Sequence, residues 1–358
     1  MIYPKFLKKG SVIGLVAPSA GISIEPYKSR FLSAVKKFED LGYKIKYNES
    51  VFLTKNMRSA SAKKRAKEFM DMYLDDTVDM IFSVAGGEFM VEILPYIDFA
   101  KLKKAKPKYF QGNSDNTNLT FTLTTLCDIA SLYAPAFPSF GMSDWYDNLK
   151  NNYDFLIGFN HSLTSFNFHE KRWLKKPEGH ELDSYYLTEK ASWKILSGQK
   201  ELHISGRVIG GCLDILICLC GTKYDKVKEY AKRYSDEKFI WYFESCDLDN
   251  PSQIRAIWQL KNAGWFDNAC AFIIGRPLKN DSVFNTSYKK ANYMHLKDFK
   301  VPVIIDADIG HVPPSMHVVN GAIMKVDIYE NDDKTTNVKI NYELKWGLYE
   351  IYWIRYLW

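Results

Sequence analysis

Three polar residues, Ser114, Glu244 and His311, each lie at or just beyond the end of a predicted strand, where the functional loops of an α/β protein gather. A serine hydroxyl is a weak nucleophile that needs a general base, and that base needs a carboxylate to orient it. The chain order serine, glutamate, histidine is the order found in α/β-hydrolases, although order alone carries little weight. The three side chains are therefore candidates for Ser-His-carboxylate chemistry.

The stretch around Ser114 has the form of a strand, a tight turn and a helix. Lys108–Gln111 predicts the strand, and the leucines of Leu119–Leu126 predict one face of the helix. A serine on such a turn projects its hydroxyl beside the free N–H groups of the helix start, which can stabilise an oxyanion. The usual pattern has a second glycine two places after the serine, where this chain has Asn116. Ser114 as an ordinary helix N-cap is the alternative.

Apolar segments alternate with amphipathic ones through the first 150 residues. Predicted strands cover 11–17, 43–47, 78–84, 108–111 and 130–134, and predicted helices cover 25–41 and 59–73. Strands that alternate with helices predict a doubly wound α/β domain over residues 1–150. The Gly86-Gly87 pair follows one of these strands; it could present an N–H group to an anion, or it could be a simple turn. It lacks the spacing of a dinucleotide site.

The rest of the chain predicts an irregular segment and a second domain. Residues 151–204 are rich in aromatic and polar residues and are expected to form a linker and a substrate-covering, β-rich insertion. Residues 205–358 are expected to form an α/β domain that is rich in strands, with a hairpin around Asn331-Asp332-Asp333. Asn250-Pro251 predicts a helix start with Asn250 as N-cap. The aromatic tail 346–358 is expected to pack on the body of the protein.

Composition indicates an ordinary globular protein: 358 residues, 46% hydrophobic, 25% charged, net charge +6. The basic run 101–108 is expected to be a solvated surface, and no nucleic-acid-binding motif is present. The six cysteines lack zinc-like pairing and are expected to be buried free thiols in a reducing compartment. Without an apolar leader or a long apolar run, we expect a cytoplasmic protein that does not bind membranes.

Six segments, in order, resemble the LD-carboxypeptidases and their relatives, the microcin C self-immunity proteins. The segments are VIGLVAPSAG, SVAGGEFMVEILPYIDF, PKYFQGNSDNTNL, GRVIGGCLDIL, FIWYFESCDLD and DADIGHVPPSMHVVNGA. The resemblance covers nearly the whole chain. It implies an N-terminal α/β domain and a C-terminal β-rich domain with the active site between them, usually in a homodimer, without a cofactor or metal.

The resemblance also assigns roles to individual residues. It implies that Ser114 is the nucleophile, His311 the general base and acid, and Glu244 its orienter. The oxyanion hole would be formed by the N–H of Asp115 and one from the Gly86-Gly87 loop, that of Gly87, with Gly86 beside the substrate. In the self-immunity branch an aromatic ring stacks on the purine of the substrate, and Trp193 is the candidate here.

The substrate stays open at this point, because the chain departs from the carboxypeptidase branch. Ala85, Glu88 and Phe89 stand where that branch has Arg before the Gly-Gly pair and Tyr-Gly after it, and Cys212 stands where it often has Asn. The substrate is either the L–D peptide bond of a muropeptide, as for a muramoyltetrapeptide carboxypeptidase, or the amide of an aminoacyl-nucleotide antibiotic of the microcin C type.

Two other interpretations remain open from sequence. The chain could be a catalytically inactive binding protein of the same fold. Alternatively, Asp306, Asp308 and His311 are close enough in sequence to hold a cation, because carboxylate and imidazole groups both bind metals.

Overall fold

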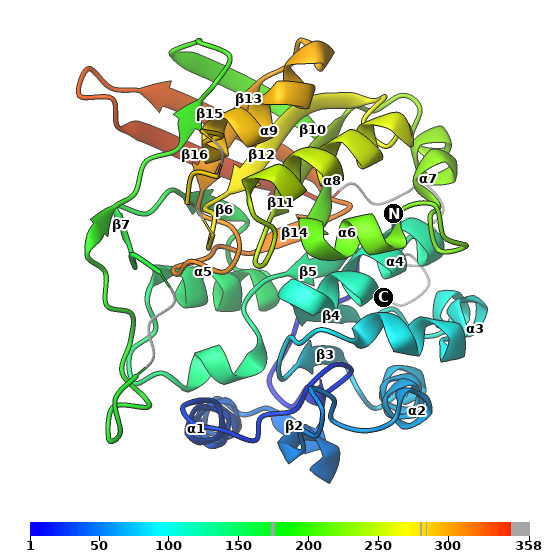
Figure 1. The fold of residues 1–358 in the computed structure, drawn as a ribbon. Coiled ribbons are helices and arrows are strands. Elements are labelled where there is room, and N and C mark those ends of the chain that lie inside the picture. Colours follow the sequence, from blue (N-terminus) through cyan, green and yellow to red (C-terminus); the bar gives the residue numbers. More distant parts are fainter. Residues whose placement is uncertain (173–175, 280, 284, 345–358) are drawn as a thin grey trace.

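The computed structural model of the chain describes residues 1–172, 176–279, 281–283 and 285–344. Its main strands form two sheets, one of six strands and one of eight, with helices packed against both (Figure 1). The predicted combination of an N-terminal α/β domain with a C-terminal, strand-rich α/β domain is confirmed.

The first sheet has the strand order β14-β5-β4-β3-β1-β2. All its neighbours are parallel except β14 and β5. Its strands are β1 (Val12–Val16), β2 (Lys44–Tyr47), β3 (Met80–Ser83), β4 (Tyr109–Gly112), β5 (Ser131–Tyr133) and β14 (Val318–Asn320). Its helices are α1 (Tyr27–Asp40), α2 (Ala62–Leu74), α3 (Phe99–Lys104), α4 (Thr117–Cys127) and α5 (Asp147–Leu156).

Helices cover both faces of this sheet, which explains why its central strands are almost uniformly apolar. Phe31 and Phe38 of α1 pack with Phe82 on one face. Phe69 of α2 packs with Ile81 on the opposite face. Neighbouring residues of β3 thus enter different cores, and the carboxyl ends of the parallel strands are left to carry the functional loops.

The second sheet has the order β6-β16-β15-β10-β11-β12-β13-β9. Its centre, β10 to β13, is parallel, and β15 and β16 form the predicted antiparallel hairpin. The bounds are β6 (Ser162–Thr164), β9 (Lys194–Ile195), β10 (Glu201–Cys212), β11 (Phe239–Glu244), β12 (Ala269–Gly275), β13 (Val303–Ala307), β15 (Ile323–Glu330) and β16 (Thr336–Glu343). Helices α6 (Leu213–Leu219), α7 (Val227–Arg233), α8 (Asn250–Asn262) and α9 (Tyr288–Leu296) accompany it.

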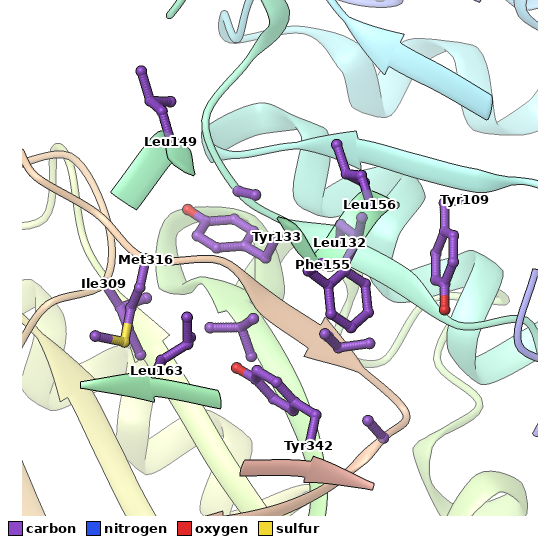
Figure 2. Packing of buried hydrophobic residues seen from close by; sticks show 14 of the residues in the cluster. Tyr109, Leu132, Tyr133, Leu149, Phe155, Leu156, Leu163, Ile309, Met316 and Tyr342 are labelled. Atoms are coloured by element: carbon purple, nitrogen blue, oxygen red, sulfur yellow. The ribbon is translucent and has the colours of Figure 1, made fainter. Parts of the chain in front are cut away.

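The two sheets are joined by the chain that follows His311. Strand β14 lies between β13 and β15 in sequence, yet it pairs with β5 of the first sheet, so that Val318 lies opposite Tyr133 (Figure 1). Figure 2 shows the apolar packing where the halves meet, with the ring of Tyr133 near Met316 and the ring of Phe155 near Tyr342. The domain limits at 150 and 204 stay a prediction, because β14 of the C-terminal half joins the first sheet, and β6 and β9 of the segment 151–204 join the second.

Some local expectations need correction. The N-cap of α8 is Asp249, whose side chain accepts a hydrogen bond from the Ser252 amide at 2.9 Å, so Asn250 is the first helical residue. All six cysteines are free, but only Cys127 and Cys212 are buried, and Cys218 is exposed. Residues 151–204 contain the end of α5 and short strands, including the pair β7 (Phe168–His169) and β8 (Glu189–Lys190).

Two further expectations concern the membrane and the chain end. None of the helices in the part of the chain that the structure describes combines the length and the apolar character that a bilayer crossing requires. The predicted packing of the aromatic tail falls outside the described residues.

Candidate active site

Ser114 lies between β4 and α4 in a backbone conformation that is unusual for a residue with a side chain. Its φ angle is +61°, in the left-handed region, where a non-glycine residue is strained. Such strain in a strand-to-helix turn is characteristic of a nucleophile elbow. The Ser114 amide donates a hydrogen bond to the Tyr133 hydroxyl at 3.0 Å, so the turn is tied to the neighbouring strand β5.

The Gly86-Gly87 loop, at the end of β3, packs directly against the serine. A Cβ atom on Gly86 would lie 3.1 Å from Ser114 Cβ and 3.3 Å from its Oγ. Gly87 has a φ of +146°, and a Cβ there would lie 2.4 Å from Ser19 Oγ. Both positions therefore need glycine, one to leave space beside the hydroxyl and the other for its conformation and its close approach to Ser19.

Asp115 uses its side chain to fix the loops around the serine. The carboxylate is almost fully buried, and it accepts hydrogen bonds from the Ser19 hydroxyl, from the Met90 amide at 2.7 Å and from Asn118 Nδ2 at 2.9 Å. Burial raises the pKa of Asp115, and these hydrogen bonds oppose that rise. The loops after β1 and β3 are thus attached to the nucleophile turn through one carboxylate.

Glu244 and His311 form a hydrogen-bonded pair from two different strand ends. Glu244 ends β11 and is 1% exposed, and His311 lies in the loop after β13. His311 Nδ1 lies 2.7 Å from Glu244 Oε2, and the Tyr133 hydroxyl donates to Glu244 Oε1. The predicted orienting carboxylate and the predicted base are therefore in contact.

The negative charge of Glu244 and a positive charge on His311 stabilise each other. Burial lowers the pKa of His311, but the Glu244 carboxylate and the Cys246 side chain outweigh burial and raise it well above its usual value. Burial raises the pKa of Glu244, but His311 and the hydrogen bonds from His311 and Tyr133 hold it below its usual range. The arrangement thus favours an ionised carboxylate beside an imidazole that readily accepts a proton.

The loop that carries His311 rests on a buried aspartate. Asp308 is fully buried; it is paired with Arg276, and its Oδ2 accepts from Trp193 Nε1 at 2.9 Å and from the Phe166 amide at 3.0 Å. Gly310 lets the loop pass close to Glu244, because the Cβ of any other residue at this position would lie 2.5 Å from Glu244 Oε2. Sequence reasoning assigned Asp308 no such role.

The sequence-level metal alternative finds no support in these contacts. Asp306 is paired with Lys194 at 2.6 Å, and Asp308 is paired with Arg276. Within the described ranges, no group of three or more His, Cys, Asp or Glu side chains is arranged to hold a metal ion.

Asp214, the second residue of α6, holds the chain that follows Glu244. Its carboxylate accepts from the amides of Cys246 (3.2 Å), Asp247 (2.8 Å) and Leu248 (3.2 Å). Sequence reasoning missed this residue, and the only signal was an acidic side chain in the first turn of a short apolar helix. Asp214 can bind these amides only because the folded chain brings α6 close to the end of β11.

Trp193, the candidate for stacking on a nucleobase, is fully buried. Its indole N–H is used by Asp308, and its backbone oxygen accepts from Thr336 Oγ1 at 3.1 Å. Its stacking role stays a prediction, and it would require the ring to leave this environment.

Two arginines that contact Phe89, beside the Gly86-Gly87 loop, are engaged by other groups. Arg58 makes two hydrogen bonds to Glu92, at 2.5 and 2.8 Å, and lies over the Phe89 ring. Arg65 donates to Glu92 at 2.6 Å and to the oxygens of Pro18 and Phe89. Arg207, within β10, is 2% exposed and paired with Glu237.

Comparison with known families decides the relationship. Residues 13–134 match the LD-carboxypeptidase N-terminal domain, and residues 205–326 match the LD-carboxypeptidase C-terminal domain. The chain belongs to the LD-carboxypeptidase family. The resemblance of the six sequence segments is therefore confirmed.

Relatives of both branches align along most of the chain. The microcin C7 self-immunity protein MccF of Escherichia coli is 25% identical over 354 residues, 94% of this chain and 95% of the relative. A Bacillus subtilis protein named as a probable murein peptide carboxypeptidase is 26% identical over 326 residues, 89% of each chain. A solved structure of MccF in complex with glutamyl sulfamoyl guanosine superposes with a TM-score of 0.76 at 22% identity, covering 96% of this chain and 99% of that one.

Proposed function

We propose that this member of the LD-carboxypeptidase family is a serine hydrolase that cleaves an amide bond with Ser114, His311 and Glu244. The observation that carries the proposal is the connected set of contacts from His311 to Glu244, from Glu244 to Tyr133, and from Tyr133 to the amide of Ser114. These contacts bring residues from the two halves of the chain to one place, which supports the proposed roles in acyl transfer.

In the proposed reaction, Ser114 Oγ attacks the carbonyl carbon of the amide while His311 takes the hydroxyl proton. The tetrahedral oxyanion is stabilised by the N–H groups of Gly87 and Asp115, since the Ser114 amide is already used by Tyr133. His311 then protonates the amine as the C–N bond breaks. Water, deprotonated by His311, attacks the acyl-enzyme, and His311 returns that proton to Ser114 Oγ as the ester bond breaks and the carboxylic acid leaves.

We propose an aminoacyl-nucleotide amide of the microcin C type as the better substrate. A muropeptide carboxylate would need a cation near the Gly86-Gly87 loop, but Ala85 is neutral, and Arg58 and Arg65 are engaged by Glu92. Glu88 adds a carboxyl group there: its partial burial and the carboxylates of Asp247, Asp115 and Asp214 raise its pKa, whereas His311 lowers it. These carboxylates disfavour a substrate with a free terminal carboxylate.

The muramoyltetrapeptide carboxypeptidase reaction is the second candidate, favoured by the similarity to the Bacillus subtilis relative. A role in peptidoglycan recycling would follow only from that reaction. For either substrate we propose a cytoplasmic homodimer that needs no cofactor, and light scattering of the purified protein tests the dimer.

Labelling with a fluorophosphonate and a substrate panel test the proposal. The wild-type chain is expected to bind the label covalently and to cleave an aminoacyl-sulfamoyl adenosine faster than a muropeptide tetrapeptide. Ser114→Ala is expected to lose labelling and to lose turnover on the order of 10⁶-fold, with an unchanged melting temperature. An unlabelled, inactive wild-type protein would favour the inactive binding protein instead.

A further inference from the structure

The hydroxyl of Tyr133 lies between two members of the proposed catalytic set. It accepts a hydrogen bond from the Ser114 amide at 3.0 Å and donates a hydrogen bond to Glu244 Oε1. A phenol has one proton to donate and lone pairs to accept with, so both bonds can exist together. The side chain is 1% exposed, so water does not compete for either bond.

Tyr133 is also the point at which the two halves of the chain meet. It ends β5 in the first sheet, and its backbone pairs with Val318 of β14, the strand that follows the His311 loop. Its ring lies 5.7 Å from that of Tyr242 on β11, two residues before Glu244. The position of its hydroxyl is therefore fixed by strands on both sides of the site.

We propose, on the basis of the function proposed above, that Tyr133 is a positioning residue that couples the orienting carboxylate to the nucleophile turn. The bond to Glu244 leaves Oε2 directed at His311 Nδ1. The bond from Ser114 holds the strained left-handed turn in place. The buried Tyr133 side chain is not placed to touch a substrate, so Tyr133 acts through Glu244 and Ser114.

The phenol also sets how strongly Glu244 attracts a proton. A hydrogen bond to a carboxylate stabilises its negative charge, so its removal makes the carboxylate more basic. A more basic Glu244 holds the imidazolium of His311 more tightly. Loss of the Tyr133 hydroxyl should therefore move the acid limb of the pH–rate profile, which reports protonation of His311, to higher pH.

The test compares Tyr133→Phe with Tyr109→Phe in the full chain. Tyr109 is a matched control, because it is a buried tyrosine on the adjacent strand β4 whose hydroxyl has no partner among the described residues. Tyr133→Phe is expected to lower kcat about 10- to 100-fold, as for loss of a hydrogen bond to a charged group, and to shift the acid limb upward. KM should change by less than about twofold, since Tyr133 makes no substrate contact. Tyr109→Phe should change neither kcat nor the profile.

A second variant tests the inference even if Tyr133→Phe does not fold. Incorporation of 3-fluorotyrosine at position 133 keeps both hydrogen bonds and makes the phenol a stronger donor, so kcat should stay near wild type and the acid limb should move to lower pH. An unchanged acid limb in this variant, or a Tyr133→Phe protein with wild-type kcat and profile, would overturn the inference. A wild-type chain that neither labels nor hydrolyses would instead overturn the proposed function, and the coupling with it.

Discussion

At the scale of single residues, the site depends on a carboxylate with both oxygens in use. Glu244 accepts from His311 on one oxygen and from Tyr133 on the other, and it is buried between Gly275 and Gly310. Other acidic residues close by in sequence have other partners: Asp247 pairs with Lys279 at 3.1 Å, and Asp249 caps α8. The geometry therefore distinguishes Glu244 from its neighbours.

Glu244→Gln is expected to lower kcat on the order of 10⁴-fold, because an amide cannot stabilise the imidazolium of His311. Asp249→Asn is the matched control, since asparagine caps a helix as well as aspartate does, and it should retain wild-type turnover. Steady-state kinetics of both variants check the prediction. A severe defect in Asp249→Asn with little effect of Glu244→Gln would reverse the assignment.

Trp193→Phe tests whether the indole supports the His311 loop or stacks on a nucleobase of the substrate. Its burial and its bond to Asp308, which supports the His311 loop, lead us to expect similar losses of kcat/KM for a nucleotide substrate and for an ester without a nucleobase. Phenylalanine keeps an aromatic face but removes the N–H donor, whereas Trp193→Ala removes both. An increase in KM of Trp193→Ala confined to the nucleotide substrate would support stacking on the base, a contact worth about 1–3 kcal/mol.

At the scale of elements, the site is made of loops that follow β3, β4, β11 and β13 and touch one another. The Gly86-Gly87 loop, the Ser114 turn and the His311 loop are held by buried carboxylates, Asp115 for the first two and Asp308 for the third.

Gly86→Ala is expected to impair catalysis without backbone strain. The added methyl group would lie 3.1 Å from Ser114 Cβ, closer than normal packing allows, so the serine or the loop must move by a few tenths of an ångström. Small displacements of a nucleophile are costly, and kcat should fall at least about tenfold. Turnover and thermal unfolding measured on the same sample check this. Unchanged turnover would mean that the Gly86-Gly87 loop can move to make room for the methyl group without displacing Ser114.

At the scale of the whole molecule, the interface between the sheets contains a buried histidine whose protonation the folded state opposes. The ring of His317 packs against Phe155 at 5.1 Å, and neither ring nitrogen has a partner among the described residues. Burial, together with His161, lowers the pKa of His317 to about 3. The unfolded chain binds a proton at about pH 6.5, so the folded state loses stability as the pH falls below that value.

His317→Leu is expected to reduce this acid sensitivity. Between about pH 6.5 and 3, the single histidine contributes a slope of at most about 1.4 kcal/mol per pH unit to the free energy of unfolding, and the variant lacks it. Urea denaturation at a series of pH values measures the slope, which is independent of any packing cost of the substitution. Equal slopes would show that His317 is protonated without penalty.

Sequence patterns predicted the elements and their order because buried parallel strands and amphipathic helices have strong periodicities. Ser114, Glu244 and His311 could be proposed because they stand at strand ends within segments that resemble the family. Tyr133, Asp214 and Asp308 could not, because their roles arise only when distant segments meet. Strand β14 has three residues and no pattern of its own, and Asp249 precedes Asn250 as an equally good cap.

The pairing of β14 with β5 also has a consequence for how the chain can be made. Five strands of the first sheet are complete by residue 133, but the sixth, residues 318–320, leaves the ribosome only after six of the eight strands of the second sheet. Until then β5 has an open edge, which is prone to pairing with other chains. We therefore expect the nascent N-terminal half to need protection of this edge, and the nucleophile turn cannot act until Glu244 and His311 have been synthesised.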